Sequence, residues 1–347
     1  MRILIATDAW SPQVNGVVRT LKATVAQLRA SGEEVEVVEP GQFRTIACPT
    51  YPEIRLSVRP YRALLQRVDA FAPDVLHVAT EGPLGLAARR IAQRMGVPLT
   101  TAYHTRFPEY VKARFGVPLA WTYAYLRWFH GAARVTLVPT PVVRADLAAR
   151  GFARLALWSR GVDTGIFHPR EGRRLEGTPP IFLYVGRVAV EKNVEAFLRL
   201  DLPGTKWVVG EGPDLERIRR AYPEARFLGV LTQDRLAEVY SGADVFVFPS
   251  RTDTFGLVLI EALACGCPVA AYPVTGPLDV LGDAAAGALD EDLRTACLAA
   301  LRIPRHNAVT HARQYTWERA TEQFLQHVRH AVSETAADDS RAAASSP

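Results

Sequence analysis

The chain has 347 residues, of which 48% are hydrophobic and 22% are charged. This composition excludes an intrinsically disordered chain, and the length exceeds what one hydrophobic core supports, so we expect two domains. The formal net charge is +5, but residues 55–134 hold twelve Arg and Lys against four Asp and Glu; this basic region suits phosphate groups, anionic lipid or nucleic acid, with an ordinary Arg-rich surface as the equal alternative.

No apolar run reaches the roughly 18 residues that a membrane-spanning helix needs, and the apolar start at residues 1–6 is too short for a secretory signal. We therefore expect a cytoplasmic protein, peripheral at the inner face of the membrane if it meets a membrane at all. The four cysteines lack metal-ligand spacing and are expected to be small, reduced core residues: Cys48, Cys265, Cys267 and Cys297.

Strands and helices alternate through the first half of the chain. Apolar runs predict strands at 2–6, 34–39, 74–79, 98–102, 135–138 and 155–158. Helical patterns lie between them, at 17–30, 60–71, 85–95, 107–133 (broken near 116–118) and 141–150, the last capped by Thr140. This alternation predicts a doubly wound parallel sheet over residues 1–165.

The second half repeats the pattern after a polar exit and linker at 161–179. Strands are predicted at 181–185, 206–209, 225–228, 244–248 and 268–271, and helices at 193–200, 213–221, 232–242, 257–265, 291–302 and 305–314. We expect a second doubly wound domain at 166–314, an amphipathic helix at 316–333, and a disordered tail at 334–347. Two such domains in tandem would share a ligand cleft.

The stretch at residues 249–261, which we name the carboxylate turn, follows a buried strand and leads into a helix. Free backbone N–H groups and the helix dipole make such a turn an anion site. Two acids bracket it, Asp253 and Glu261. Arg187 and Lys192 follow another strand, and a bidentate guanidinium with a point-charge ammonium suits a diphosphate. Either cation alone would more often be an ordinary surface residue.

Two further glycine turns follow strands, at Gly210 and at Gly229-Val230. Half of such turns are only tight connections, but a glycine also lets a ligand approach the backbone.

Together these motifs resemble the glycosyltransferases with two Rossmann-like domains, the GT-B fold. The narrower resemblance is to glycosyltransferase family 4 ("glycosyl transferases group 1"), a retaining family that includes sucrose synthases, bacterial α-mannosyltransferases and sulfoquinovosyl lipid synthases. It covers about residues 1–333 and is carried by Gly186-Arg187 with Lys192, 210–213, 249–262, Asn15-Gly16-Val17, Tyr103-His104-Thr105 and the Trp317 helix.

The resemblance implies a hexosyltransferase of the EC 2.4 class. Residues 1–165 would bind the acceptor, residues 166–314 would bind the nucleotide sugar, and a C-terminal helix at 315–333 would cross back to the N-terminal domain. The resemblance also implies a role for each matching residue. Arg187 and Lys192 would hold the diphosphate and stabilise the leaving group, and His104 would contact the donor sugar near the reacting carbon. Glu261 would bind the ribose, and Gly16 would let a loop close on the diphosphate. The remaining donor contacts would come from Thr254, Phe255, Gly256 and Leu257 for sugar and phosphate, and from residues 227–230 for the base.

Asp253 departs from the family pattern, which usually has Glu at this position. The shorter arm, by about 1.5 Å, favours a sugar-hydroxyl contact over a direct nucleophilic role. Asp8 and Gln13, in the first loop, are candidate acceptor-side groups. His77 and His130 are expected to be structural.

The donor and acceptor stay open at this point. Mannose from GDP-mannose, transferred to a lipid or polysaccharide, is the first candidate, and a UDP-sugar-dependent glycolipid synthase is the second. A nucleotide-sugar epimerase or hydrolase of the same fold and a non-catalytic binding protein are the remaining alternatives. No acidic pair with metal spacing accompanies the diphosphate site, so we expect no cofactor and no metal.

Aromatic and basic residues are interleaved over residues 106–134. This pattern fits an anionic membrane surface, and packed core aromatics are the equal alternative. Nucleic acid is disfavoured because no recognised module is present.

Overall fold

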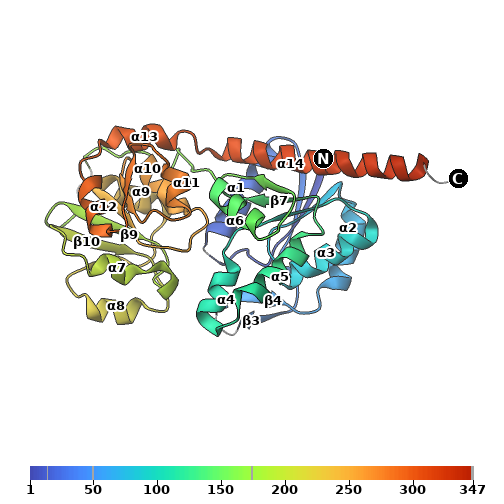
Figure 1. Cartoon of the computed structure of the whole chain (residues 1–347), viewed down its shortest axis with the longest axis horizontal. Coiled ribbons are helices and arrows are strands. Elements are labelled where there is room, and N and C mark those ends of the chain that lie inside the picture. Colours follow the sequence, from blue (N-terminus) through green and yellow to red (C-terminus); the bar gives the residue numbers. More distant parts are fainter. Residues whose placement is uncertain (14, 49–50, 173–174, 345–347) are drawn as a thin grey trace. The chain divides into compact units, whose positions relative to one another are not determined.

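The computed structural model describes residues 1–13, 15–48, 51–172 and 175–344 (Figure 1). The chain divides into two compact units: unit 1 combines Met1–Ser159 with the C-terminal segment from Trp317, and unit 2 is Arg160–Thr316. Residues 160–165, which we had assigned to the first domain, lie in unit 2, because Val162 forms a β-bridge with Thr316 and Phe167 packs into the unit 2 core.

Unit 1 is built on a six-stranded parallel sheet in the order β2-β1-β5-β6-β7-β8. Its strands are β1 (Arg2–Ala6), β2 (Glu34–Val38), β5 (Val75–Val78), β6 (Leu99–Ala102), β7 (Val135–Val138) and β8 (Leu155–Leu157). Its helices are α1 (Gly16–Ala30), α2 (Tyr61–Phe71), α3 (Pro83–Met95), α4 (Phe107–Phe115), α5 (Leu119–His130), α6 (Pro141–Ala149) and α14 (Trp317–Ala344), with a 3₁₀ turn at Pro40–Gln42.

Helices cover both faces of this sheet, as the alternation of β1 shows. Leu4 and Ala6 face a cluster with α2, α3 and α5, whereas Ile3 and Ile5 face a cluster with α1 and α14. A strand buried on both faces must be apolar at every position, which is why the run at residues 2–6 lacks polar alternation. Thr140 caps α6 by accepting a hydrogen bond from Val143 N, as predicted.

Unit 2 has a second six-stranded parallel sheet in the order β11-β10-β9-β12-β13-β14. Its strands are β9 (Ile181–Val185), β10 (Thr205–Val209), β11 (Arg226–Phe227), β12 (Val245–Phe248), β13 (Val269–Ala271) and β14 (Gly287–Leu289). Its helices are α7 (Val194–Leu198), α8 (Leu215–Ala221), α9 (Gln233–Gly242), α10 (Leu257–Ala264), α11 (Pro277–Leu281), α12 (Leu293–Ala300) and α13 (Arg305–Ala312), with a 3₁₀ turn at Val190–Lys192. The two doubly wound sheets confirm the predicted α/β class.

Besides the boundary at residue 160, the structure adds two elements that were not predicted, α11 and β14, and it corrects the prediction in two further regions. An antiparallel hairpin of β3 (Thr45–Cys48) and β4 (Tyr51–Ser57) lies where no strand was predicted; its exposed Ile46 and Ala47 carry no burial pattern. The tail predicted to be disordered from residue 334 is helical to Ala344; residues 345–347 lie outside the described part. Ala, Glu and Arg favour helix, and extending a formed helix needs no new nucleus.

Candidate functional site

The loops after β9 and β12 lie at the point in unit 2 where the strand order reverses. The chain runs outward from β9 through β10 to β11, and then returns to the other side of β9 with β12. In open α/β sheets, ligands bind at the carboxyl ends of the strands at this switch point. The loop after β9 carries Arg187 and Lys192, and the loop after β12 is the carboxylate turn.

The two loops meet through a charged pair. Lys192 Nζ contacts the Asp253 carboxylate through Oδ1, and the two side chains are only 22% and 16% exposed. The other oxygen, Oδ2, is buried and has no hydrogen-bond partner among the described residues. A buried carboxylate oxygen without a donor is costly, so a ligand hydroxyl at Oδ2 would complete this site.

Backbone and side-chain hydrogen bonds hold these loops together. Asn193 takes a left-handed conformation with φ of 54°, and its Nδ2 donates to the Pro249 carbonyl at 3.1 Å. Thr252 Oγ1 donates to the Glu191 carbonyl at 3.3 Å, and Tyr184 OH donates to the Arg187 carbonyl at 2.8 Å. The loop at residues 186–193, which we name the cation loop, is thus tied both to its own strand and to the carboxylate turn.

Gly210 serves backbone packing. Its N–H donates to the Gly229 carbonyl at 2.8 Å, and a Cβ at Gly210 would lie 2.0 Å from the Gly186 carbonyl oxygen. The sequence left two uses open for this glycine, a tight connection between elements and a close approach of a ligand. The structure provides direct evidence for the tight connection. Gly229 has more space, because a Cβ there would meet its nearest neighbour, Glu211 Oε1, only at 3.8 Å, and the adjacent Val230 is 59% exposed.

The carboxylate turn leads directly into α10. Gly256, with φ of 83°, precedes the first helical residue Leu257, while Thr254 and Phe255 are buried beneath the turn. Glu261 lies further along α10 and is 2% exposed. The ribose contact predicted for Glu261 stays a prediction.

The corresponding switch point of unit 1 lies between β1 and β5, where Ala6 pairs with Val78. Asp8, predicted to face the acceptor, is buried there and caps α3. Its oxygens accept hydrogen bonds from Thr80 Oγ1 at 2.9 Å, Leu84 N at 3.0 Å and Gly85 N at 3.3 Å. Burial raises the pKa of the Asp8 carboxyl, and these hydrogen bonds offset the rise only in part. Asp8 therefore has partners inside the loop, and the acceptor contact predicted for it stays a prediction.

Gly16 and His104 follow strands of the same sheet. Gly16 is the exposed first residue of α1, whose cap Asn15 accepts a hydrogen bond from Val18 N at 3.0 Å. His104 follows β6 and is half-buried, with its ring edge against Trp158 at a centroid distance of 5.4 Å. Gln13 Nε2 donates to the Asp8 carbonyl at 3.3 Å.

Glu81 is the residue at this switch point that the sequence prediction missed. It follows β5, and its Oε1 lies 3.2 Å from His130 Nε2. Its position in Thr80-Glu81-Gly82-Pro83, between a strand and a helix that starts with proline, was the available signal. His77, as predicted, is a core residue, packed against Phe324 and Trp158.

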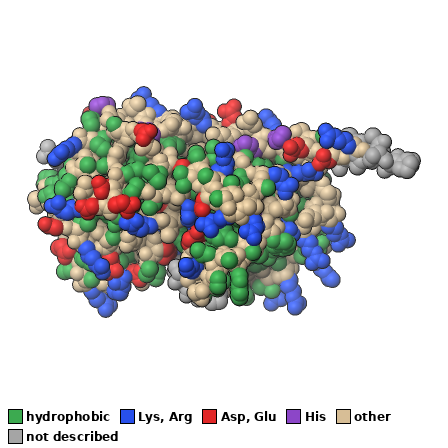
Figure 2. Space-filling view, in the orientation of Figure 1, with side chains coloured by type: hydrophobic (Ala, Val, Ile, Leu, Met, Phe, Trp, Pro, Cys, Tyr) green, Lys and Arg blue, Asp and Glu red, His purple; other side chains and the backbone are tan. Residues whose placement is uncertain are grey.

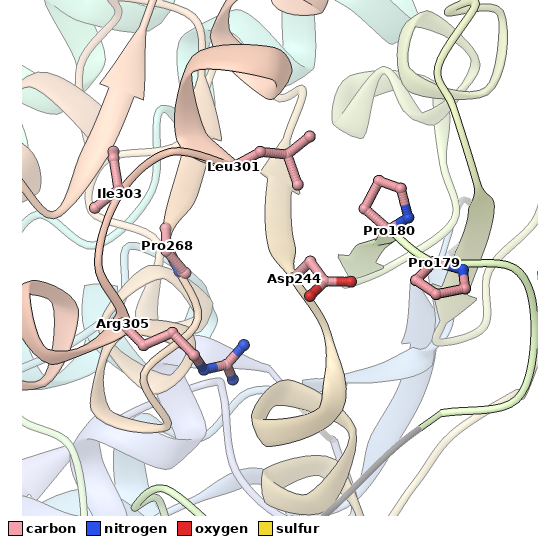
Figure 3. A pocket seen from close by; sticks show the side chains of 7 residues that line it. All are labelled: Pro179, Pro180, Asp244, Pro268, Leu301, Ile303 and Arg305. Carbon is pink, nitrogen blue, oxygen red and sulfur yellow. The ribbon is translucent and has the colours of Figure 1, made fainter.

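A hollow of about 300 Å³ in unit 2 lies at the other end of the sheet (Figure 3). Its lining includes Pro180, Asp244 and Pro268, which precede β9, β12 and β13. Asp244 Oδ2 already accepts from Ile181 N, and Arg305 donates to the Ala243 and Ser241 carbonyls. Its polar groups therefore serve the fold.

The described residues contain no cluster of metal-ligating side chains. No group of three or more His, Cys, Asp or Glu there could hold a metal ion, and the need for a metal stays untested. Within the same residues, no helix has the length and apolarity to cross a bilayer.

Known structures with the same architecture identify the class. Sucrose-phosphate synthase from Thermosynechococcus elongatus superposes with a TM-score of 0.74 at 21% identity, over 95% of this chain and 98% of that one. The Anabaena protein HepE, solved with UDP, gives 0.70 at 15% identity over 95% and 100%. The fold is that of the GT-B glycosyltransferases, as predicted.

Sequence comparison then gives the family. Residues 14–165 match the model of glycosyltransferase family 4, and residues 179–302 match that of the glycosyl transferases group 1. The chain is 34% identical over 311 residues to a GDP-mannose-dependent alpha-mannosyltransferase of Mycobacterium tuberculosis, covering 81% of each. It is 33% identical to a sulfoquinovosyl transferase of Arabidopsis thaliana. That match covers 77% of this chain and 58% of the plant protein. The chain belongs to glycosyltransferase family 4 and is a glycosyltransferase.

Proposed function

We propose that this enzyme transfers a hexose from a nucleoside diphosphate sugar to a hydroxyl of a lipid or polysaccharide, with retention at the anomeric carbon. Mannose from GDP-mannose is the first candidate. The observation that carries the proposal is the placement of Arg187 and Lys192 beside the carboxylate turn, at the switch point of unit 2.

The reaction breaks the bond between the anomeric carbon and the diphosphate oxygen and forms a bond from that carbon to the acceptor oxygen. The acceptor hydroxyl releases its proton to solvent, and the nucleoside diphosphate leaves with the electrons of the bond that breaks. Negative charge therefore grows on the diphosphate as positive charge grows on the sugar. Fixed cations aimed at the leaving group stabilise this transition state, and one such donor is commonly worth about 3–4 kcal/mol.

The other residues of unit 2 fit contacts to the donor. Asp253 Oδ2, buried without a partner among the described residues, suits a sugar hydroxyl. The backbone around Gly256 and Leu257 suits sugar and phosphate oxygens, Glu261 the ribose, and the loop at Gly229 and Val230 the base. In unit 1, His104 would contact the donor sugar and Gly16 the diphosphate.

Mannose is favoured by the names of several relatives. Three of those at 28–34% identity are GDP-mannose-dependent alpha-mannosyltransferases. Others are a sulfoquinovosyl transferase and alpha-monoglucosyldiacylglycerol synthases, which keeps a UDP-sugar-dependent glycolipid synthase as the second candidate.

A two-stage experiment tests the proposal. A thermal-shift screen of GDP-, UDP- and ADP-sugars should show stabilisation by one donor class, with GDP-mannose expected. The protein is then incubated with that donor, with and without a membrane-lipid extract or polysaccharide. Nucleotide release that needs the acceptor, with a labelled product of retained configuration by NMR, supports transfer. A new free sugar or epimer in the absence of acceptor would establish the hydrolase or epimerase alternative instead.

A control variant separates catalysis from a non-catalytic binding role. Arg187→Ala with Lys192→Ala should abolish transfer and weaken donor binding, whereas Arg220→Ala, an exposed cation on α8, should change neither. If the cellular phenotype and ligand binding survive the double change, the protein has a non-catalytic role. We also expect activity to persist in EDTA, and complete loss would contradict the metal-independent mechanism.

We also propose that an anionic lipid surface is a partner, because exposed aromatic and basic side chains lie together on unit 1. Trp121 and Trp128 of α5 are 72% and 54% exposed. The Arg89 guanidinium lies 3.9 Å from the Trp128 ring centre, and Arg90 is exposed on α3. Figure 2 shows hydrophobic and basic side chains side by side over this part of unit 1. Aromatics at an interface with cations facing anionic headgroups suit peripheral binding.

Vesicle sedimentation tests this partner. Binding to phosphatidylglycerol-containing vesicles should exceed binding to pure phosphatidylcholine and fall as salt is added. The double variant Trp121→Ser with Trp128→Ser should lose binding to the anionic vesicles. Ile46 is another exposed apolar residue, on β3, and Ile46→Ser should retain that binding. Equal binding to both vesicle types, without salt dependence, would remove the membrane from the proposal.

A further inference from the structure

Glu81 lies at the switch point of unit 1, at the carboxyl end of β5 and between two loops already described. In the sheet, β5 has β1 on one side and β6 on the other, so Glu81 is flanked by the loop of Asp8 and the loop of His104. Ligands of open α/β sheets bind at this position. The side chain is 18% exposed.

The Glu81 carboxylate is held from one side only. His130 Nε2 lies 3.2 Å from Oε1, and Tyr125 OH donates to the Glu81 backbone carbonyl at 2.8 Å. The second carboxylate oxygen, Oε2, makes no hydrogen bond to any described residue. One oxygen thus fixes the orientation of the group, and the other remains available as an acceptor.

A buried chain of hydrogen bonds fixes His130 in turn. Its Nδ1 lies 2.9 Å from Thr101 Oγ1, which lies 3.0 Å from Thr136 Oγ1. His130, Thr101 and Thr136 are all at most 3% exposed. A ring bonded at both nitrogens cannot rotate without breaking a buried hydrogen bond, so it presents Nε2 to Glu81 in a constant geometry.

The other carboxylate at this switch point, Asp8, accepts hydrogen bonds inside the loop on both oxygens. The donors are Thr80 and the first turn of α3. The packing is tight, because a Cβ at Gly82 would lie 2.5 Å from the Asp8 carboxylate. Asp8 therefore builds the loop that carries Glu81.

From this arrangement we infer that Glu81 binds the acceptor: its Oε2 accepts a hydrogen bond from a hydroxyl of the acceptor head group, and His130 is the residue that positions it. The inference rests on the proposed transferase function. An ionised carboxylate only accepts hydrogen bonds, so the group recognised is a hydroxyl, as on glycerol or a sugar, and not a phosphate. The bond is charge-assisted, which makes it stronger than a neutral one.

Steady-state kinetics with a membrane-lipid extract as the acceptor and GDP-mannose as the donor test the inference. Glu81→Gln should raise the apparent KM for the extract or lower kcat/KM for it by about 10- to 100-fold, the effect of losing a charge-assisted hydrogen bond. For Glu81→Gln, KM for GDP-mannose should stay within about twofold of the wild-type value. The thermal shift that GDP-mannose produces should match that of wild type. Glu34→Gln, an exposed carboxylate at the opposite edge of the same sheet, is the matched control and should behave as wild type.

Two substitutions at His130 separate positioning from mere packing. Asn reproduces the Nδ1 position toward Thr101 but loses the group that faces Glu81, whereas Gln extends an amide toward Glu81. His130→Asn should therefore lower kcat/KM for the acceptor as Glu81→Gln does. His130→Gln should have a higher kcat/KM for the acceptor than His130→Asn, although the two variants have equal thermal stability.

The outcomes are distinguishable. If wild type transfers sugar and Glu81→Gln folds normally with an unchanged acceptor kcat/KM, the role of Glu81 is wrong while the proposed function stands. An equal loss for donor and acceptor would also overturn it, because the residue would then act on the donor or the fold. If wild type transfers nothing to the extract from GDP-mannose or from any donor found in the thermal-shift screen, the proposed function fails first, and this inference with it.

Discussion

Lys192 Nζ contacts the carboxylate of Asp253 across the carboxyl ends of β9 and β12, two adjacent strands of the unit 2 sheet. The pair joins a cation predicted to bind diphosphate to the residue that departs from the family pattern. Asp253 Oδ1 contacts Lys192, while Oδ2 is buried without a hydrogen-bond partner among the described residues.

Substitution of the cations tests the leaving-group role. Arg187→Ala and Lys192→Met should each lower kcat by about 100- to 1,000-fold, because each removes a charge aimed at the departing diphosphate. Circular dichroism should show an intact fold. A loss of less than about tenfold for both variants would mean that these side chains do not stabilise the transition state.

Asp253 can be altered in charge or in length. Asp253→Asn should lower kcat/KM for the donor by about 10- to 100-fold, because the charge toward Lys192 and the sugar is lost. Asp253→Glu keeps the charge and should be the milder change. Asp234→Asn, on a side chain that is 76% exposed, is the control and should be neutral. Equal activity of Asp253→Asn and wild type would remove the residue from the site.

The turn at Gly210 should not tolerate a side chain, whereas the turn at Gly229 should be less sensitive. At Gly210 a Cβ would lie 2.0 Å from the Gly186 carbonyl oxygen, and φ is +130°, so Gly210→Ala combines a clash with backbone strain. We expect the melting temperature of unit 2 to fall well below that of Gly229→Ala, where φ is +67° but the space is open and only strain of about 1 kcal/mol applies. Matching melting temperatures in differential scanning calorimetry would contradict this packing.

Buried His77 should make unit 1 less stable in acid. Burial lowers the pKa of His77 from 6.5 to about 3, so between these values the unfolded chain binds a proton that the folded chain does not. The free energy of unfolding should therefore fall as pH drops through this window, by about 1.4 kcal/mol per pH unit for this group. His77→Asn should remove that slope in urea titrations at several pH values between about 5 and 7. His330→Asn, exposed on α14, should leave it unchanged.

The packing of α14 on unit 1 can be tested at Phe324, which is fully buried against Trp158 and His77. Phe324→Ala should destabilise unit 1 by about 3–5 kcal/mol through lost burial and a cavity. Glu322→Ala, on the exposed side of the same helix, should cost little. A small effect of Phe324→Ala in chemical denaturation would mean that α14 contributes little to this core.

Much of the fold was predictable because it depends on local patterns. Strands buried on both faces, such as β1 and β12, must be continuously apolar, and the polar turns after them mark the carboxyl ends. The hairpin of β3 and β4 carries no such pattern, since its strands are not buried in a core. The end of α14 was mistaken for disorder because a polar, Ala-rich composition suits both states, and attachment to a formed helix decides between them. There the Arg134–Asp338 ion pair joins it to unit 1.

The amino-acid sequence by itself determined the α/β class, and its resemblance to a known family indicated the GT-B fold and the family. It also predicted the residues of the cation loop and the carboxylate turn, because these residues lie within short segments. Only the tertiary structure decided which residues from distant segments meet. It placed Asp253 on Lys192 and used Asp8 to cap α3, 72 or more residues away in the chain. It also placed Glu81, with a side chain that is 18% exposed, at the same switch point as Asp8. The physical reason is that strand order and register set these neighbours, which lie far apart in the sequence.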